Sequence, residues 1–128
     1  MAKDKGIACS LHPSSYPTSI FITRDDYDVM LNEMKSDAVK YCPDTGHIAR
    51  GDMDVYEIFT TYMSMIDHVH MKDITNDKKW AANGEGIIDF PNLMSMLDQA
   101  DYEGWVVFEE ESDLSRLFPD SATIMNGL

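Results

Sequence analysis

Side chains that can bind a metal ion recur in this chain wherever an apolar run ends. They fall in three segments: Asp44-Thr45-Gly46-His47, His68-Val69-His70-Met71-Lys72-Asp73 and Glu109-Glu110-Glu111. Carboxylates and imidazoles are common ligands of divalent metal ions. If the apolar runs are parallel strands, their carboxyl ends meet at one edge of the sheet. The series therefore predicts a divalent metal site.

Such a site could perform proton-transfer chemistry on a small molecule. An ion held by mixed oxygen and nitrogen ligands can bind two neighbouring oxygens of such a molecule and acidify the adjacent C–H or O–H. A carboxylate at the ion could then move the proton. Lys72 could offset the charge of an oxyanion or phosphate, or be an ordinary polar residue at a strand end. Glu111 could be a second base if the strand continues, although a solvated loop acid is the favoured interpretation.

Four strands are expected to position these residues. They run from Ile7 to His12, Ala38 to Cys42, His68 to Lys72 and Trp105 to Glu109. Helical patterns alternate with them, which favours parallel strands joined by crossover helices. The caps and apolar faces of three helices are Thr23 with Tyr27, Met30, Leu31 and Met34; Asp54 with Val55, Ile58, Phe59, Tyr62 and Ile66; and Asp89 with Phe90, Leu93, Met94 and Leu97. A weaker helix is expected from Ser112, interrupted at Pro119.

The strand pattern also predicts which side chains converge. Successive side chains alternate between the two faces of a strand. If the functional residue of each strand points to the inner face, Asp44, His70 and Glu109 meet in one volume. His12, at the end of the first strand, would be a fourth member of the group.

Purely structural roles remain open for each of these residues. Asp44 and His47 could close a turn through side-chain hydrogen bonds. His70 could be a core histidine, and Glu109 could form a structural ion pair. His12 could be a polar strand end. Gly84 and Gly86 match a short phosphate-loop pattern, but that pattern alone is weak, and a turn ahead of the Asp89 cap explains them.

Composition limits the classes of function. The chain has 128 residues and a formal charge of −13, with 23 Asp and Glu against 10 Lys and Arg. Nucleic acid is a poor partner because phosphate binding needs clustered Lys and Arg. No apolar run approaches the length of a membrane span. The charged N-terminal segment has no small-residue cleavage site, so a cytoplasmic location is expected. Cys9 and Cys42 are expected to be buried free thiols.

The stretch from Cys42 to Asp113 resembles the C-terminal half of the xylose-isomerase-like TIM-barrel superfamily, which includes sugar phosphate isomerases, epimerases and inosose dehydratases. The resemblance rests on four segments in order: Asp44-Thr45-Gly46-His47, His68-Val69-His70-Met71-Lys72-Asp73, Gly84-Glu85-Gly86-Ile87-Ile88-Asp89-Phe90 and Tyr102-Glu103-Gly104-Trp105-Val106-Val107-Phe108-Glu109. The segment from His12 to Leu31 resembles the preceding strand and helix less closely.

The resemblance implies roles for these residues. Asp44, His70 and Glu109 would be ligands of a divalent ion such as Mn, Mg, Co or Zn, and Glu109 would also act as acid or base. His47 would contact substrate oxygens or a second metal. The remaining ligand in this family is usually a glutamate, and His12 holds that place here. The implied function is a metal-dependent isomerase, epimerase or dehydratase acting on a small sugar, sugar phosphate or inosose.

The length points to an incomplete barrel. A complete (β/α)8 barrel has eight strand–helix units and typically about 250 residues. Residues 1–128 are therefore expected to form a single α/β domain of four units, half of a TIM barrel, with two open strand edges. Two copies could pair these edges into a closed eight-stranded sheet, so a homodimer or a complementary half-barrel is the expected partner.

Other interpretations of the half-barrel stay open. The chain could be a truncated product, one half of a split protein, or a non-catalytic scaffold that kept its site residues by descent. An apurinic endonuclease relative shares the Asp-Thr-x-His pattern. That class is disfavoured by the acidic charge and by the absence of further histidines after Asp73.

Overall fold

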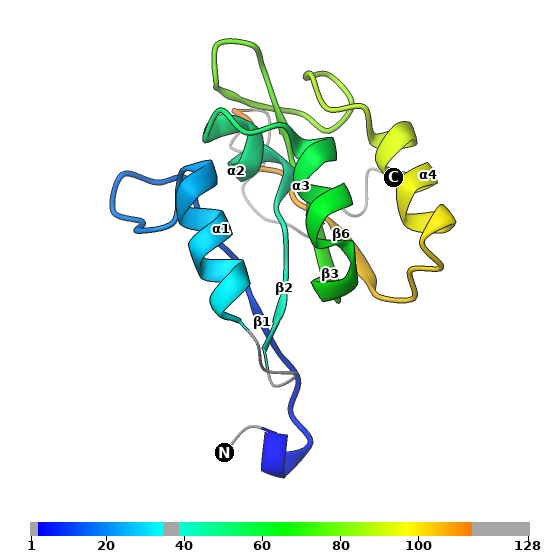
Figure 1. Cartoon of the computed structure of the whole chain (residues 1–128). Helices are drawn as coiled ribbons and strands as arrows, with labels where there is room; N and C mark the ends of the chain where they lie inside the picture. Colours follow the sequence, from blue (N-terminus) through cyan, green and yellow to red (C-terminus); the bar gives the residue numbers. More distant parts are fainter. Residues whose placement is uncertain (1–2, 35–38, 114–128) are drawn as a thin grey trace.

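The structure is a computed structural model that describes residues 3–34 and 39–113 (Figure 1). The strands are β1 (Cys9–Leu11), β2 (Val39–Tyr41), β3 (His68–Met71), β4 (Asp73–Ile74), β5 (Trp80–Ala81) and β6 (Trp105–Phe108). The α-helices are α1 (Arg24–Glu33), α2 (Thr45–Arg50), α3 (Val55–Tyr62) and α4 (Phe90–Gln99). Two short 3-10 helices, η1 (Lys3–Lys5) and η2 (Met63–Met65), complete the described elements.

Four strands run parallel to one another in the order β1-β2-β3-β6. β1 pairs with β2, and β3 pairs with β6. Parallel bridges between Tyr41 and Ile66 and between Asp44 and His70 join the two pairs. Each of the four predicted parallel strands is therefore present, although β1 covers only half of its predicted range, Ile7 to His12. Ala38, the predicted first residue of the second strand, lies outside the described residues.

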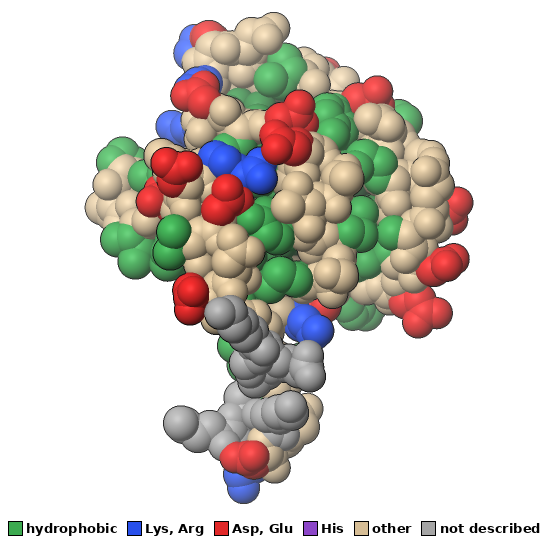
Figure 2. Space-filling model, viewed as in Figure 1, with side chains coloured by type: hydrophobic (Ala, Val, Ile, Leu, Met, Phe, Trp, Pro, Cys, Tyr) green, Lys and Arg blue, Asp and Glu red, His purple; other side chains and the backbone are tan. Residues whose placement is uncertain are grey.

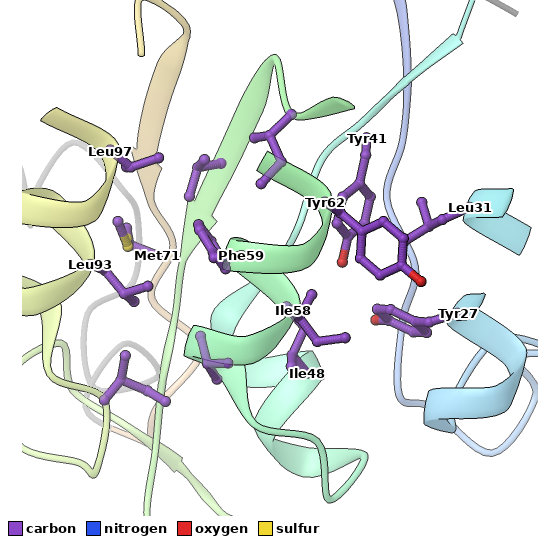
Figure 3. Packing of buried hydrophobic residues seen from close by; sticks show 14 of the residues in the cluster. Tyr27, Leu31, Tyr41, Ile48, Ile58, Phe59, Tyr62, Met71, Leu93 and Leu97 are labelled. Atoms are coloured by element: carbon purple, nitrogen blue, oxygen red, sulfur yellow. The ribbon is translucent and has the colours of Figure 1, made fainter. Parts of the chain in front are cut away.

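The helices α1, α3 and α4 lie on one side of these strands, as Figure 1 shows. Their apolar faces pack on the outward side chains of the strands, and Figure 3 shows Phe59 of α3 among residues of neighbouring elements. Tyr41 of β2 and Val69 and Met71 of β3 are completely buried beneath the helices. Because these side chains point outward, the alternate residues of the same strands must face the opposite side of the sheet.

The predicted caps begin the three longer helices. Thr23 forms a capping box with Asp26 at the start of α1. Asp54 accepts a hydrogen bond from the backbone N–H of Glu57, and Asp89 accepts one from Asn92. Each side chain satisfies a backbone donor that has no partner within its helix.

Three features differ from the sequence-based expectations. Helix α2 follows β2 directly, although no helix was expected there, because its six residues are too few to show helical periodicity. The β4–β5 hairpin lies between the strand expected at His68 to Lys72 and the helix expected after Asp89, where no further strand was expected. Met94 is 44% exposed, because the buried stripe of α4 is narrow and consists of Phe90, Leu93 and Leu97. The helix expected from Ser112 falls almost entirely outside the described residues.

Carboxylates are scattered over the surface. Figure 2 shows many acidic and few basic side chains on one face, with hydrophobic side chains between them. The formal charge of −13 agrees with this distribution. Among residues 3–34 and 39–113, no helix is long and apolar enough to cross a membrane.

Candidate metal centre

The four residues expected to converge do so. His12, Asp44, His70 and Glu109 each offer one possible ligand atom, and these atoms all lie within 4.8 Å of one another. His12 follows β1, Asp44 follows β2, and Glu109 follows β6, while His70 lies in the second half of β3. The cluster thus forms at the carboxyl ends of the four parallel strands, where such folds place functional groups.

Asp44 uses its two carboxylate oxygens differently. Oδ1 accepts a hydrogen bond of 2.8 Å from the backbone N–H of His47 and so caps helix α2. Oδ2 lies 3.5 Å from Nε2 of His12. Both of these atoms are buried, and neither makes a hydrogen bond to another described residue.

Two buried atoms without hydrogen-bond partners carry a substantial desolvation cost. A divalent ion held by Asp44 Oδ2 and His12 Nε2 would remove that cost, because both atoms would then act as ligands. The set of two imidazoles and two carboxylates suits zinc, manganese, cobalt or, less well, magnesium. The residues present therefore fit a divalent ion.

Glu109 is oriented by two neighbours. Its Oε2 lies 2.7 Å from Nδ1 of His70, and its Oε1 lies 2.6 Å from Nζ of Lys72. Burial alone would raise the pKa of Glu109, but Lys72 and His70 hold that pKa below its ordinary value. Burial also opposes ionisation of Asp44, yet His12, the His47 N–H and Lys72 keep its pKa low. Both carboxylates are ionised at neutral pH, as metal ligands must be.

Lys72 lies inside the cluster, with a side chain that is only 1% exposed. Its Nζ is 3.6 Å from Asp44 Oδ2 and 3.3 Å from Glu111 Oε2, in addition to the short contact with Glu109. Burial lowers the pKa of Lys72, but the three carboxylates raise it above its ordinary value, so the amine stays charged. Three carboxylates and one ammonium leave two negative charges, which one divalent ion would balance.

His47 lies at the edge of the cluster, on helix α2. Its ring centroid is 5.8 Å from that of His12, 5.5 Å from that of Tyr16 and 5.1 Å from that of Trp80. Nδ1 accepts a hydrogen bond of 3.1 Å from the backbone N–H of Ser15. Burial lowers the pKa of His47, so the ring is neutral and carries its proton on Nε2. This N–H can donate to an oxygen of a bound molecule.

An open hollow of about 430 Å³ lies over the cluster on the side of the strands away from the helices. Its lining residues are Ser10, His12, Cys42, His68, His70 and Glu109. These residues alternate along their strands, which confirms the predicted inner face. His68 lines the hollow without belonging to the group of four that converges.

The sequence did not single out Tyr16 or Trp80 as site residues, although both pack against His47. The only local feature that could have identified Trp80 as a site residue is its position, an aromatic residue within a polar loop. Gly84 and Gly86 lie in a turn ahead of Asp89, as the structural interpretation expected, and not in a phosphate loop. Their backbone N–H groups donate to the Asp73 carboxylate, over 2.9 and 2.8 Å respectively, and are not free for a phosphate.

Curated proteins named inosose dehydratase are similar in sequence to this chain. An inosose dehydratase from Clostridium beijerinckii is 30% identical over 131 aligned residues, which cover 88% of this chain and 43% of that protein. The chain thus spans less than half the length of this curated relative.

Solved structures share the fold. The D-allulose 3-epimerase from Methylomonas sp. has a TM-score of 0.67 at 25% identity, over 87% of this chain and 38% of that one. The IolI protein, solved with a bound zinc atom, has a TM-score of 0.70 at 19% identity, over 87% of this chain and 42% of that one. The family model described as "Xylose isomerase-like TIM barrel" matches residues 1–126. The chain therefore belongs to the xylose isomerase-like TIM barrel family.

Proposed function

We propose that this chain carries the metal-binding half of a divalent-metal-dependent isomerase, epimerase or dehydratase that acts on a small sugar, sugar phosphate or inosose. One observation carries the proposal: His12, Asp44, His70 and Glu109 converge within 4.8 Å at the carboxyl ends of parallel strands. The inosose dehydratase and epimerase relatives support the substrate class.

His12, Asp44, His70 and Glu109 would hold the ion. When bound, a divalent ion at this place would polarise neighbouring substrate oxygens and acidify the adjacent C–H or O–H. Manganese, magnesium, cobalt and zinc are the candidates, and the bound zinc of the IolI structure favours zinc among them.

The protein's own residues would position the substrate and move the proton. Glu109 borders the open hollow as an ionised carboxylate and would accept a proton from the substrate. His47 would donate its Nε2–H to a substrate oxygen and so orient it. Lys72 would contact a substrate oxygen on which negative charge develops, while its contact with Glu109 keeps that carboxylate in place.

The proposed half-barrel would need a second half to enclose a substrate. The hollow over the cluster is open, and the chain spans less than half of its curated relatives. A second copy of this chain, or a complementary half-barrel, would supply the missing wall. The exposed apolar residues of β6 favour a second candidate function, namely a non-catalytic half-barrel that acts through protein association.

Metal binding by single-site variants tests the proposal. Asp44→Ala and His70→Ala should each weaken Mn²⁺ or Zn²⁺ binding by about 100-fold or more, because each removes a ligand. Isothermal titration calorimetry measures the affinity, and circular dichroism checks that the fold is retained. His68→Ala is the matched control, because His68 lines the same hollow outside the cluster. Unchanged affinity in both ligand variants would refute the site.

Turnover distinguishes the two candidate functions. The metal-loaded protein is incubated with ketoses, ketose phosphates and inososes, and the products are separated by chromatography. Isomerised or dehydrated products that disappear in Glu109→Gln support the enzyme. Metal binding without any turnover supports the non-catalytic alternative.

A further inference from the structure

A second cavity, of about 210 Å³, lies beside the metal-ligand cluster. Its lining residues are Arg50, Lys78, Lys79, Trp80, Glu111 and Asp113. Three of the ten Lys and Arg residues of the chain line it, although the chain has 23 Asp and Glu. The cavity therefore gathers positive charge in a strongly acidic protein.

Arg50 is the central residue of this cavity. Its guanidinium carbon lies 4.7 Å from the Trp80 ring centroid and 5.8 Å from the Tyr16 ring centroid. Within the described part of the chain, no ion pair joins Arg50 to a carboxylate, whereas Arg24 is bound by both Asp28 and Glu57. Aromatic rings contact a guanidinium group through its face, so the N–H groups of Arg50 could still bind two oxygens of an oxyanion.

The two acidic residues of the cavity already interact with other groups. Glu111 Oε2 lies 3.3 Å from Lys72 Nζ and accepts a hydrogen bond of 3.1 Å from the Tyr16 hydroxyl. Asp113, the second acidic residue, acts on Lys79: Asp77 and, more weakly, Asp113 raise the pKa of the Lys79 ammonium group. Among the described residues, therefore, no carboxylate forms an ion pair with Arg50.

The two lysines are held only by surface ion pairs. Lys78 lies 2.6 Å from Asp52, and Lys79 lies 2.6 Å from Asp77, with all four side chains at least 45% exposed. Surface pairs of this kind contribute little free energy. Either ammonium group can therefore turn toward a bound anion at small cost.

One aromatic ring separates the cavity from the metal-ligand cluster. The Trp80 ring centroid lies 4.7 Å from the Arg50 guanidinium carbon and 4.9 Å from Lys72 Nζ, and it also contacts the ring of His47. Trp80 thus lies between Arg50 and the Lys72 and His47 side chains that would contact the substrate.

We propose that Arg50, assisted by Lys78 and Lys79, binds an anionic group at the end of the substrate remote from the metal. The group is an oxyanion, either a phosphate or a carboxylate, so the substrate is a sugar phosphate or a sugar acid. This inference rests on the proposed function, because the cavity is a substrate subsite only if a substrate binds at the cluster. Anion binding by the cavity can still be tested without metal or turnover.

The two tryptophans provide an internal control for that test. Trp80 lines the cavity, whereas Trp105 lies at the opposite end of β6 from the cluster. The ¹⁵N-labelled, metal-free full chain is titrated with inorganic phosphate and, separately, with gluconate, and the indole N–H signals are followed by NMR. The Trp80 signal should shift with saturation, and the Trp105 signal should not. Tighter binding of phosphate indicates a sugar phosphate, and tighter binding of gluconate indicates a sugar acid.

Variants identify the group that binds the anion. Arg50→Gln should weaken binding of the preferred anion by at least about tenfold, because a charge-assisted bidentate contact is lost. Arg24→Gln is the matched control and should bind the anion as the unmodified chain does. Absence of a Trp80 shift with both anions, or equal affinity in Arg50→Gln, would overturn the proposal.

Metal titrations keep this inference separate from the proposed function. Arg50→Gln should bind Mn²⁺ as the unmodified chain does, because Arg50 is outside the cluster. His70→Ala should lose Mn²⁺ binding and still bind the anion. Loss of both ligands in either variant would show that the two sites are not independent and would overturn the assignment of Arg50.

Discussion

Cys42 shows how burial controls the chemistry of a single residue. Its side chain is 4% exposed, and burial, helped by nearby Asp44 and Asp67, raises its pKa to about 12. The thiolate is the reactive form of cysteine, so a raised pKa suppresses reactivity. Cys9 is half-buried in β1 and is also a free thiol.

We predict that the native protein exposes one reactive thiol. At pH 8, Ellman's reagent should modify Cys9 readily and Cys42 only after unfolding in guanidinium chloride. The control variant Cys9→Ser should show almost no reaction in the native state. Rapid modification of that variant would contradict the burial of Cys42.

At the scale of an element, Asp73 organises the segment between β4 and α4. Its buried carboxylate accepts backbone hydrogen bonds from Ile74, Gly84, Gly86 and Ile88. A Cβ atom at Gly86 would lie 2.2 Å from Asp73 Oδ1, so glycine is required for this close approach. The conformation of the segment therefore depends on one side chain.

Replacement of Asp73 should destabilise the protein. In Asp73→Asn, the amide NH₂ would face backbone donors that need an acceptor, and we expect a loss of about 2–4 kcal/mol in the free energy of unfolding. Urea denaturation measures the loss. Asp77→Asn, which affects an exposed ion pair in the adjacent turn, should change stability by less than about 0.5 kcal/mol. Equal effects would contradict the special role of Asp73.

Two carboxylates of helix α1 should make the stability of the protein depend on pH in the acidic range. The Tyr62 hydroxyl and Arg24 lower the pKa of Asp28, and backbone and side-chain contacts from Thr23 lower that of Asp26. A carboxyl group whose pKa is lower in the folded state stabilises the fold above its unfolded pKa, near 4. That stabilisation is lost as the pH falls through the folded pKa.

We therefore expect the melting temperature to fall as the pH drops from about 5 to 2, because both carboxylates become protonated. Asp28→Asn should lower stability at pH 6 and reduce this dependence. Asp98→Asn, at an exposed position of α4, is the control. A dependence as steep in Asp28→Asn as in the unmodified chain would contradict the assignment.

At the scale of the whole molecule, β1 and β6 are the two edges of the parallel sheet that residues 3–34 and 39–113 form. The β6 edge exposes large apolar side chains: Trp105 is 74% exposed and Phe108 is 58% exposed. Unpaired apolar edges favour association with another strand. Parallel pairing of β6 with β1 of a second copy would close an eight-stranded sheet.

A homodimer thus remains the predicted assembly, and light scattering should give twice the mass of one chain. Phe108→Lys should convert the dimer to a monomer, because it places a charge at the edge. Val29→Lys, at an equally exposed site on α1, should leave the dimer intact. A monomeric unmodified chain would contradict the homodimer and leave a complementary half-barrel as the predicted partner.

The cytoplasmic location also stays a prediction.

Much of the architecture followed from local rules. Caps such as Thr23 and Asp54, and the alternation that puts His68 and His70 on one face, depend on residues close in the sequence. Helix α2 and the β4–β5 hairpin did not, because elements of two to six residues carry too little periodicity to be recognised.

The sequence by itself determined the four parallel strands and which residues stand at their carboxyl ends, so the convergence of His12, Asp44, His70 and Glu109 was predictable. The position of Lys72 among three carboxylates, and of Trp80 between His47 and Arg50, was decided only by the tertiary structure. These contacts join loops and strands far apart in the chain. A repeating local pattern specifies which face a residue occupies, but packing between distant segments selects its neighbours.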